Sequence, residues 1–209
     1  MKRSFHAHIL TFLETEIVPR YDRFDAGHGR DHVHAVMHSA EKLAQFYPDV
    51  DETMLQVAAA YHDVGLERGR EHHHSDSAAI MRADLRLRQW FSEAEIHLMA
   101  DAAEDHRASA KREPRTIYGR LLAEADRQIN PRTVVLRAMQ YTRTHFPDYT
   151  EEQQWQRLLE HMQNKYAEGG YLRLWIPESD NATRLANLRA LIADTSRLRS
   201  LFNSLLPHI

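Results

Sequence analysis

The feature that most constrains this chain is the run Met54–Leu66 (MLQVAAAYHDVGL), which places His62 and Asp63 in an almost wholly apolar segment. Nine of its thirteen residues are apolar, and the only polar side chains are those of Gln56, His62 and Asp63. Such a run predicts a helix buried on most of its surface. Because an isolated carboxylate is costly to remove from water, a buried Asp is normally paired or metal-bound. The His–Asp pair therefore indicates a binding site.

Two further residues could complete a metal site. His32 lies in the segment GRDHVHAV, one predicted helix upstream, and Asp126 lies downstream in LLAEADRQI. Asp126 follows Leu122 by four positions and precedes Ile129 by three, so it shares their inward-facing stripe. With the His–Asp pair, these residues offer two imidazoles and two carboxylates. That set suits a divalent ion such as Mn, Fe, Co, Ni, Mg or Zn, and it lacks the thiolates of a typical structural zinc site.

The composition is that of an ordinary globular protein. The chain has 209 residues, of which 43% are hydrophobic and 27% charged, enough for one sizeable core. A net charge of −3 provides no global basic field for nucleic acid. The absence of cysteine fits a reducing compartment, and no run approaches the ~20 apolar residues needed to span a membrane. We therefore expect a cytoplasmic protein with a small-molecule partner, and the oligomeric state stays open.

Helical periodicity extends along the whole chain, so we expect an all-α fold. Helices are expected over about 5–17, 31–47, from Asp51 through the His–Asp run, after Ser75, and over 92–104, 116–126, from Asn130, from Thr150 and over 182–205. Capping-box patterns mark the helix starts at Ser92 and Thr150. The segment 169–179 (GGYLRLWIPES) is the one stretch that could be extended and pack as a lid or brace.

The ordered motifs resemble those of the HD-domain superfamily of metal-dependent phosphohydrolases. GRDHVHAV, AAAYHDVG and LLAEADRQI are similar to its first-His, His-Asp and final-Asp motifs. The tail is similar to that of bacterial single-domain HD hydrolases. The resemblance implies an HD-domain helical bundle forming a single domain over 1–209. Its metal-site core would span about 25–130 and a C-terminal helical extension about 131–209.

The resemblance also implies one divalent metal ion, held by His32, His62, Asp63 and Asp126. Such an ion would activate water and stabilise charge developing on phosphorus, with Asp63 counted among the catalytic residues. In some hydrolases of this superfamily an acidic pair follows the HD motif by three and four residues. Here Leu66 replaces the first acid, and Glu67 is the candidate to orient water. The alternative is that Glu67 is an exposed charge at a helix end.

Two more histidines, His74 and His106, fall between the His–Asp pair and Asp126. In two-metal members of the superfamily, extra histidines occupy comparable places. We expect both to contact substrate phosphate rather than a second metal. The reasons are that the spacing after the His–Asp pair is short and that no additional acidic ligand is evident between them. His72 and His73 are expected to be exposed loop residues.

Basic residues gather beside each predicted ligand segment. They are Arg30, Arg68, Arg70, Arg107, Lys111 and Arg112. Guanidinium groups suit bidentate contact with phosphate, although any single one could be ordinary surface. We take Arg30, Arg107 and Lys111 as substrate-binding candidates.

The remaining histidines and aromatic residues carry weaker expectations. His34 and His38 are spaced i, i+4 but are expected on the surface, and His28 at the rim of the pocket. Four aromatic residues are expected to pack in the core or under a lid: Tyr118, Trp155, Tyr171 and Trp175.

Together these features predict hydrolysis of a phosphoester or phosphoanhydride in a nucleotide-like small molecule. Two alternatives remain within the superfamily. A di-iron oxygenase would use His74 and His106 as metal ligands. A catalytically silent protein would bind metal and ligand without turnover.

Overall fold

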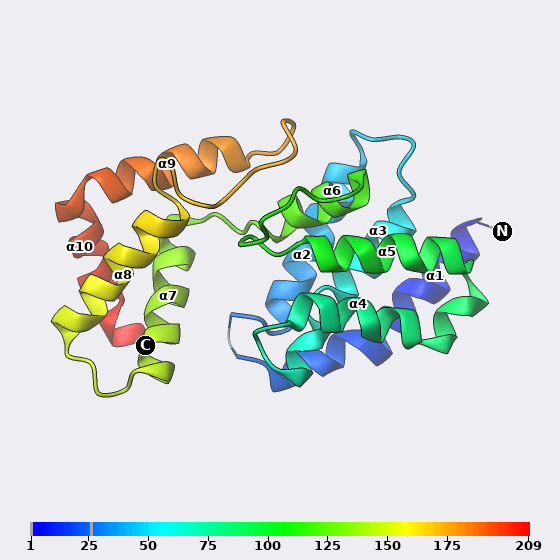
Figure 1. The fold of residues 1–209 in the computed structure, drawn as a ribbon, viewed down its shortest axis with the longest axis horizontal. Helices are drawn as coiled ribbons and strands as arrows, with labels where there is room; N and C mark the ends of the chain where they lie inside the picture. Colours follow the sequence, from blue (N-terminus) through cyan, green and yellow to red (C-terminus); the bar gives the residue numbers. More distant parts are fainter. Residues whose placement is uncertain (1, 26) are drawn as a thin grey trace. The chain divides into compact units, whose positions relative to one another are not determined.

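The computed structural model describes residues 2–25 and 27–209, and within these residues every regular element is a helix (Figure 1). The predicted all-α fold is confirmed. The chain divides into two compact units, Met1–Arg127 and Gln128–Ile209. In the described part of the chain, none of the helices combines the length and the apolar character needed to cross a membrane.

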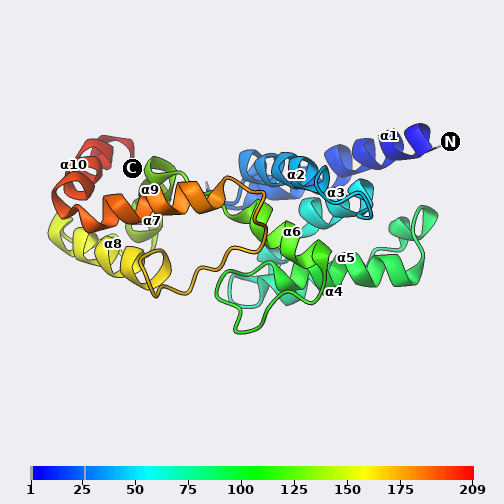
Figure 2. The ribbon, with the colours of Figure 1, turned by 90° about the horizontal axis from the view of Figure 1, so that it is seen from above.

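The N-terminal unit holds α1 to α6. Their bounds are Lys2–Phe12, Arg30–Ala44, Glu52–Tyr61, His73–Ala83, Glu93–Asp105 and Ile117–Asp126. Short π- and 3₁₀-helical turns join them: η1 Leu13–Ile17, η2 Val18–Arg23, η3 Val64–Arg68 and η4 Leu85–Gln89. Helix α2 packs on α3 and α6, while α5 packs on α3, α4 and α6 (Figures 1 and 2). The short helix α3 is therefore enclosed by its neighbours.

Helix α3 begins at the predicted cap, where the Asp51 side chain accepts hydrogen bonds from the backbone of Thr53 and Met54. From Leu55 to Tyr61 its apolar side chains have no exposed surface. The helix ends at Tyr61, short of the predicted Leu66. His62 and Asp63 therefore lie at the end of the helix, and Asp63 has φ −112° and ψ 3°. This change of direction turns both side chains toward the ends of other helices.

Two further expectations need correction. Helix α4 begins at His73, two residues before Ser75. The expected helix over 182–205 is broken at Asp194, whose side chain accepts from the Arg197 amide and starts a new helix. The segment 169–179 is not helical in the structure, and its residues Leu172 and Ile176 are buried, as a packed brace would require.

The C-terminal unit holds α7 to α10. Their bounds are Pro131–His145, Glu151–Lys165, Asn181–Ala193 and Thr195–Leu205, followed by the 3₁₀ turn η5 Leu206–His208. The capping boxes at Ser92 and Thr150 are both present. Trp155 is buried against Phe202, with ring centroids 5.5 Å apart, so its predicted core position is confirmed. Tyr118 is also buried, whereas Tyr171 is exposed, so packing was wrongly expected for Tyr171.

Candidate metal centre

Helix ends of the N-terminal unit bring five ionisable side chains together. His32 lies in the first turn of α2, His62 and Asp63 follow the last residue of α3, His106 follows α5, and Asp126 ends α6. The side chains of His32, His62, Asp63 and His106 are almost completely buried, whereas that of Asp126 is 20% exposed. Asp126 therefore lies at the point where the cluster meets solvent.

The four ligands predicted from the sequence lie close together, with the two imidazoles between the carboxylates of Asp63 and Asp126. His62 Nε2 lies 3.1 Å and His32 Nε2 3.5 Å from Asp63 Oδ2. The two Nε2 atoms are 3.2 Å apart, and His32 Nε2 lies 3.3 Å from Asp126 Oδ1. The ligand atoms of His32, His62 and Asp63 are close enough to hold one ion together. The predicted grouping of these side chains is thus present in the fold.

The other oxygen of Asp63 faces a second group. His73 Nε2 and His106 Nε2 each lie 3.5 Å from Asp63 Oδ1. These three residues also meet the spacing needed to hold a metal ion. His106 was predicted near the site, but His73 was expected in an exposed loop, and that expectation is wrong.

The protonation pattern of the imidazoles fits a bound cation. His62, His73 and His106 place Nδ1 at 2.7, 2.8 and 2.5 Å from the carbonyl oxygens of Ala59, Arg70 and Ala103. A carbonyl oxygen only accepts, so Nδ1 carries the proton, and in a neutral imidazole Nε2 is then a bare acceptor. In their neutral forms, the three Nε2 atoms would face carboxylate oxygens, which are also acceptors. Burial opposes a charge on His106, but its hydrogen bond to Asp63 raises its pKa, so a positive charge is favoured at this place. This arrangement is typical of metal-bound histidines, because a cation between the acceptors removes their repulsion.

The charges of the clustered carboxylates also favour a bound cation. Burial opposes a charged imidazole, yet hydrogen bonding to Asp126 and Asp63 raises the pKa of His32 to about 9. Burial disfavours the carboxylates too, but the neighbouring imidazoles hold the pKa values of Asp63 and Asp126 well below the usual range. Both acids are therefore anionic at neutral pH, and the cluster attracts positive charge. Burial and the nearby His106 lower the pKa of His73 to about 4, so it is available as a neutral ligand.

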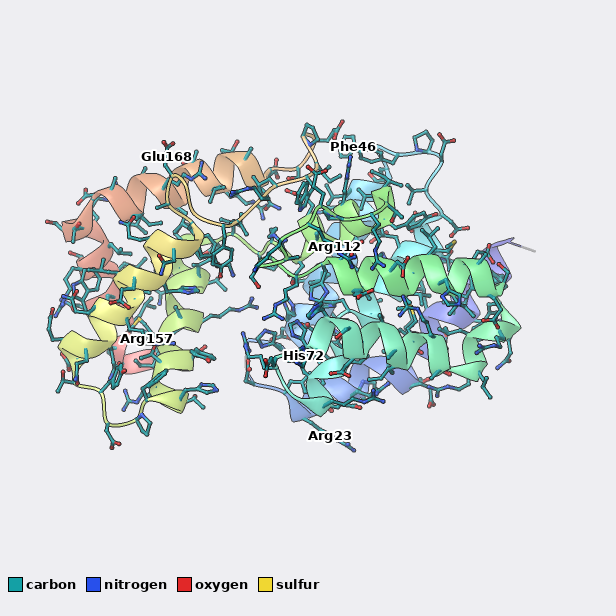
Figure 3. The ribbon with its side chains drawn as sticks, viewed as in Figure 1. Arg23, Phe46, His72, Arg112, Arg157 and Glu168 are labelled. Atoms are coloured by element: carbon teal, nitrogen blue, oxygen red, sulfur yellow. The ribbon has the colours of Figure 1, made fainter. Side chains whose placement is uncertain are left out.

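A close backbone contact explains the place of His73. Gly65 in η3 donates its N–H to Ser77 Oγ at 2.9 Å, which ties η3 to α4. A Cβ atom on Gly65 would lie 2.0 Å from the His73 carbonyl oxygen, so no larger residue fits. The early start of α4 then turns His73 inward, leaving His72 exposed as predicted (Figure 3). The HHH triplet was the available sequence signal, but it could not indicate which ring faces inward.

Two buried side chains hold the ligand segments in place. Tyr21 donates its hydroxyl to the Ala60 carbonyl at 2.9 Å and accepts from the Asp63 amide at 3.2 Å. Arg127 donates from Nη1 to the His106 carbonyl at 3.0 Å and to Asp126 Oδ2 at 3.3 Å. Neither residue was singled out from the sequence, because both act through contacts between distant segments.

Glu67 is held by an ion pair rather than directed to the cluster. Arg20 donates from Nε and Nη2 to the two carboxylate oxygens at 2.7 and 2.6 Å. This hydrogen bonding lowers the pKa of Glu67, which weakens it as a base. The geometry therefore favours the alternative stated above, a paired charge at the surface.

The predicted substrate-binding residues are distributed unevenly. Arg30 is exposed and paired with Asp22, with its Nη2 2.6 Å from Oδ2. Arg107 instead donates to the Glu71 carbonyl at 2.6 Å, and its Nη1 lies 3.4 Å from His74 Nδ1. The His74 ring lies 5.6 Å from the His73 ring, so Arg107 and His74 border the cluster. His28 also borders it, with its ring 5.8 Å from that of His32.

Two other groups of basic and histidine residues are surface features. Arg68 and Arg70 are exposed and lie 3.5 Å from Asp76 and Asp25. His34 and His38 are exposed, as predicted.

Comparison with known protein families identifies this helical unit. The HD-domain family matches residues 29–130, and this part of the chain belongs to the HD-domain superfamily. The match contains every residue of the two ligand groups, and the superfamily includes metal-dependent hydrolases. Neither a curated protein nor a solved structure gave a significant match to the chain.

Proposed function

We propose that this protein is a metal-dependent phosphohydrolase acting on a phosphoester or phosphoanhydride of a nucleotide-like small molecule. The observation that carries the proposal is the meeting of imidazole nitrogens with the buried carboxylate of Asp63 and the partly exposed carboxylate of Asp126. Such a set is unfavourable without a cation, and divalent ions favour N and O ligands of this kind. A bound ion supplies Lewis-acid stabilisation and activates water.

We assign the residues of the cluster to two ion positions that share Asp63. His32, His62, Asp126 and one oxygen of Asp63 would hold one ion. His73, His106 and the other Asp63 oxygen would hold the second. This differs from the single ion expected from the sequence, because His73 Nε2 and His106 Nε2 both lie 3.5 Å from Asp63 Oδ1. His106 then contributes a ligand rather than a contact to substrate.

Side chains beside the ions would orient the substrate. Arg107 and His74 border the second ligand group and are the strongest candidates to hold the reacting phosphate. Lys111 follows on the same loop between α5 and α6. Arg30 remains a candidate, although it would first have to leave Asp22.

The proposal is tested by metal analysis of gently purified protein, followed by a phosphate-release screen. The screen should include nucleoside mono-, di- and triphosphates with Mn, Co, Ni and Mg. Asp63→Asn serves as the matched inactive control, since it removes the charge and keeps the size. Phosphate release by the wild-type chain and none by the variant is expected. Equal release by both proteins would overturn the proposal.

A di-iron oxygenase is the second candidate, and the sharing of Asp63 by two ligand groups is the observation that favours it. Iron at two ions per chain together with oxygen consumption would identify this activity. Phosphate release without oxygen consumption would exclude it.

A further inference from the structure

A cavity of about 410 Å³ adjoins the second ligand group. Its walls are formed by His74, Glu104, Asp105, Ala110, Lys111 and Arg112. His74 connects this cavity to the centre, because its ring lies 5.6 Å from that of the proposed ligand His73. Asp105, the last residue of α5, also lines the cavity and directly precedes the proposed ligand His106. The cavity therefore lies next to the second ligand group.

The acidic residues of this cavity are already neutralised. Asp105 is buried, and its carboxylate accepts from the amide and the Nε of Arg115 at 2.7 and 2.9 Å. Arg112 lies 3.1 Å from the same carboxylate. Glu104 accepts from Arg115 Nη2 at 2.7 Å. These pairs leave no carboxylate in the cavity free to bind a cation.

The positive charge of the same region is not balanced. Among the described residues, Lys111 has no carboxylate within ion-pair distance, and Arg107 donates only to a carbonyl, a hydroxyl and His74. Lys111 is exposed, so its ammonium group can reach a ligand in the cavity without losing an internal partner. A local excess of cations beside an open cavity favours an anion.

We infer that this cavity binds a second anionic group of the substrate, distinct from the phosphate that is hydrolysed at the ions. The inference rests on the proposed function and narrows its substrate class. The substrate carries two anionic groups, as in a nucleoside di- or triphosphate, and Lys111 contacts the group that is not attacked. A monophosphate would fill the metal centre and leave the cavity empty.

The test compares inorganic phosphate with tripolyphosphate by calorimetric titration of the full-length, metal-loaded protein. Excess Mg²⁺ prevents the longer ligand from removing the ions, and metal content is measured before and after. Wild-type protein is expected to bind tripolyphosphate at least about tenfold more tightly than phosphate. Lys111→Met should remove about tenfold or more of the tripolyphosphate affinity, the scale of one charge-assisted hydrogen bond, and change phosphate affinity less than about twofold.

Lys42→Met is the matched control, because Lys42 is exposed on α2 and should leave both affinities unchanged. Lys111 is chosen over Arg112 because its removal exposes no buried acid. Unchanged tripolyphosphate affinity in Lys111→Met, or equal affinity for the two ligands in wild-type protein, would overturn the inference while leaving the proposed function intact. If neither ligand binds the metal-loaded protein, both the inference and the proposed function fail.

Discussion

The two compact units differ in what they bury. In the N-terminal unit, ionisable side chains lie in the interior: His32, His62, Asp63, Asp105, His106, Glu124 and Arg127. In the described residues of the C-terminal unit, the buried polar side chains are uncharged: Thr142, Gln154 and Asn181. Burying an ionised group is costly unless a partner or ion compensates it. The N-terminal unit therefore buries the side chains of the candidate metal centre, whereas the interior of the C-terminal unit is an apolar core.

The largest expected effect is the loss of Asp63, the residue shared by both ligand groups. Asp63→Ala should abolish metal binding and hydrolysis, because each ion position loses its central carboxylate. The variant should also lose the stabilisation that a native-state ligand provides, about 2.7 kcal/mol at a hundredfold excess over Kd. Elemental analysis and melting curves with and without chelator measure both effects.

Asp148→Ala, an exposed change in the C-terminal unit, is the control for Asp63→Ala and should alter neither metal content nor melting. Full metal occupancy in Asp63→Ala would contradict a metal centre around Asp63 in the N-terminal unit.

A substitution in the core of the C-terminal unit should lower stability and leave the metal content unchanged. Phe202 is fully buried against Trp155, so Phe202→Ala should cost about 3–5 kcal/mol of unfolding free energy. Metal content should stay at the wild-type level wherever the N-terminal unit remains folded. Denaturant unfolding, followed together with metal analysis, makes the comparison.

Phe46→Ala is the control for Phe202→Ala, because Phe46 is 56% exposed (Figure 3) and should change stability by no more than about 0.5 kcal/mol. Metal loss in Phe202→Ala before any unfolding would show that the second unit supports the centre.

A smaller, local effect separates His73 from His74 within the first unit. His73→Ala should lower the metal content from two ions to one per chain, since it removes a ligand beside Asp63. His74→Ala should keep both ions and weaken phosphate binding, because its side chain faces Arg107. Elemental analysis of the two variants, purified side by side, provides the measurement. The reverse result, metal loss in His74→Ala alone, would make His74 rather than His73 a metal ligand and contradict this assignment.

The smallest effect is expected at Glu67. Because its carboxylate forms a partly exposed pair with Arg20, Glu67→Gln should cost less than about 1 kcal/mol of stability. Turnover on the identified substrate should fall less than about tenfold. A loss of about 10²–10⁴-fold with metal content intact would instead identify Glu67 as a general base. Arg20→Met provides the companion change, because it frees the Glu67 carboxylate while leaving it in place.

Much of the fold could be predicted from short-range patterns. The capping residues Asp51, Ser92 and Thr150 lie where they were expected, since a cap and its helix are neighbours in sequence. The break at Asp194 was not predicted, because the leucines on either side of it continue a helical period. Asp126 could be placed near the His–Asp pair because an acid on an apolar stripe needs a partner.

By itself, the sequence predicted that the chain is helical and that a His–Asp pair in an apolar run needs a charged partner or a bound ion. Both conclusions follow from local periodicity and from the cost of burying charge. Only the tertiary structure decided that His73 rather than His74 faces Asp63. Successive residues of a helix point about 100° apart. The start of α4, set by the contact at Gly65, therefore determines which ring points inward.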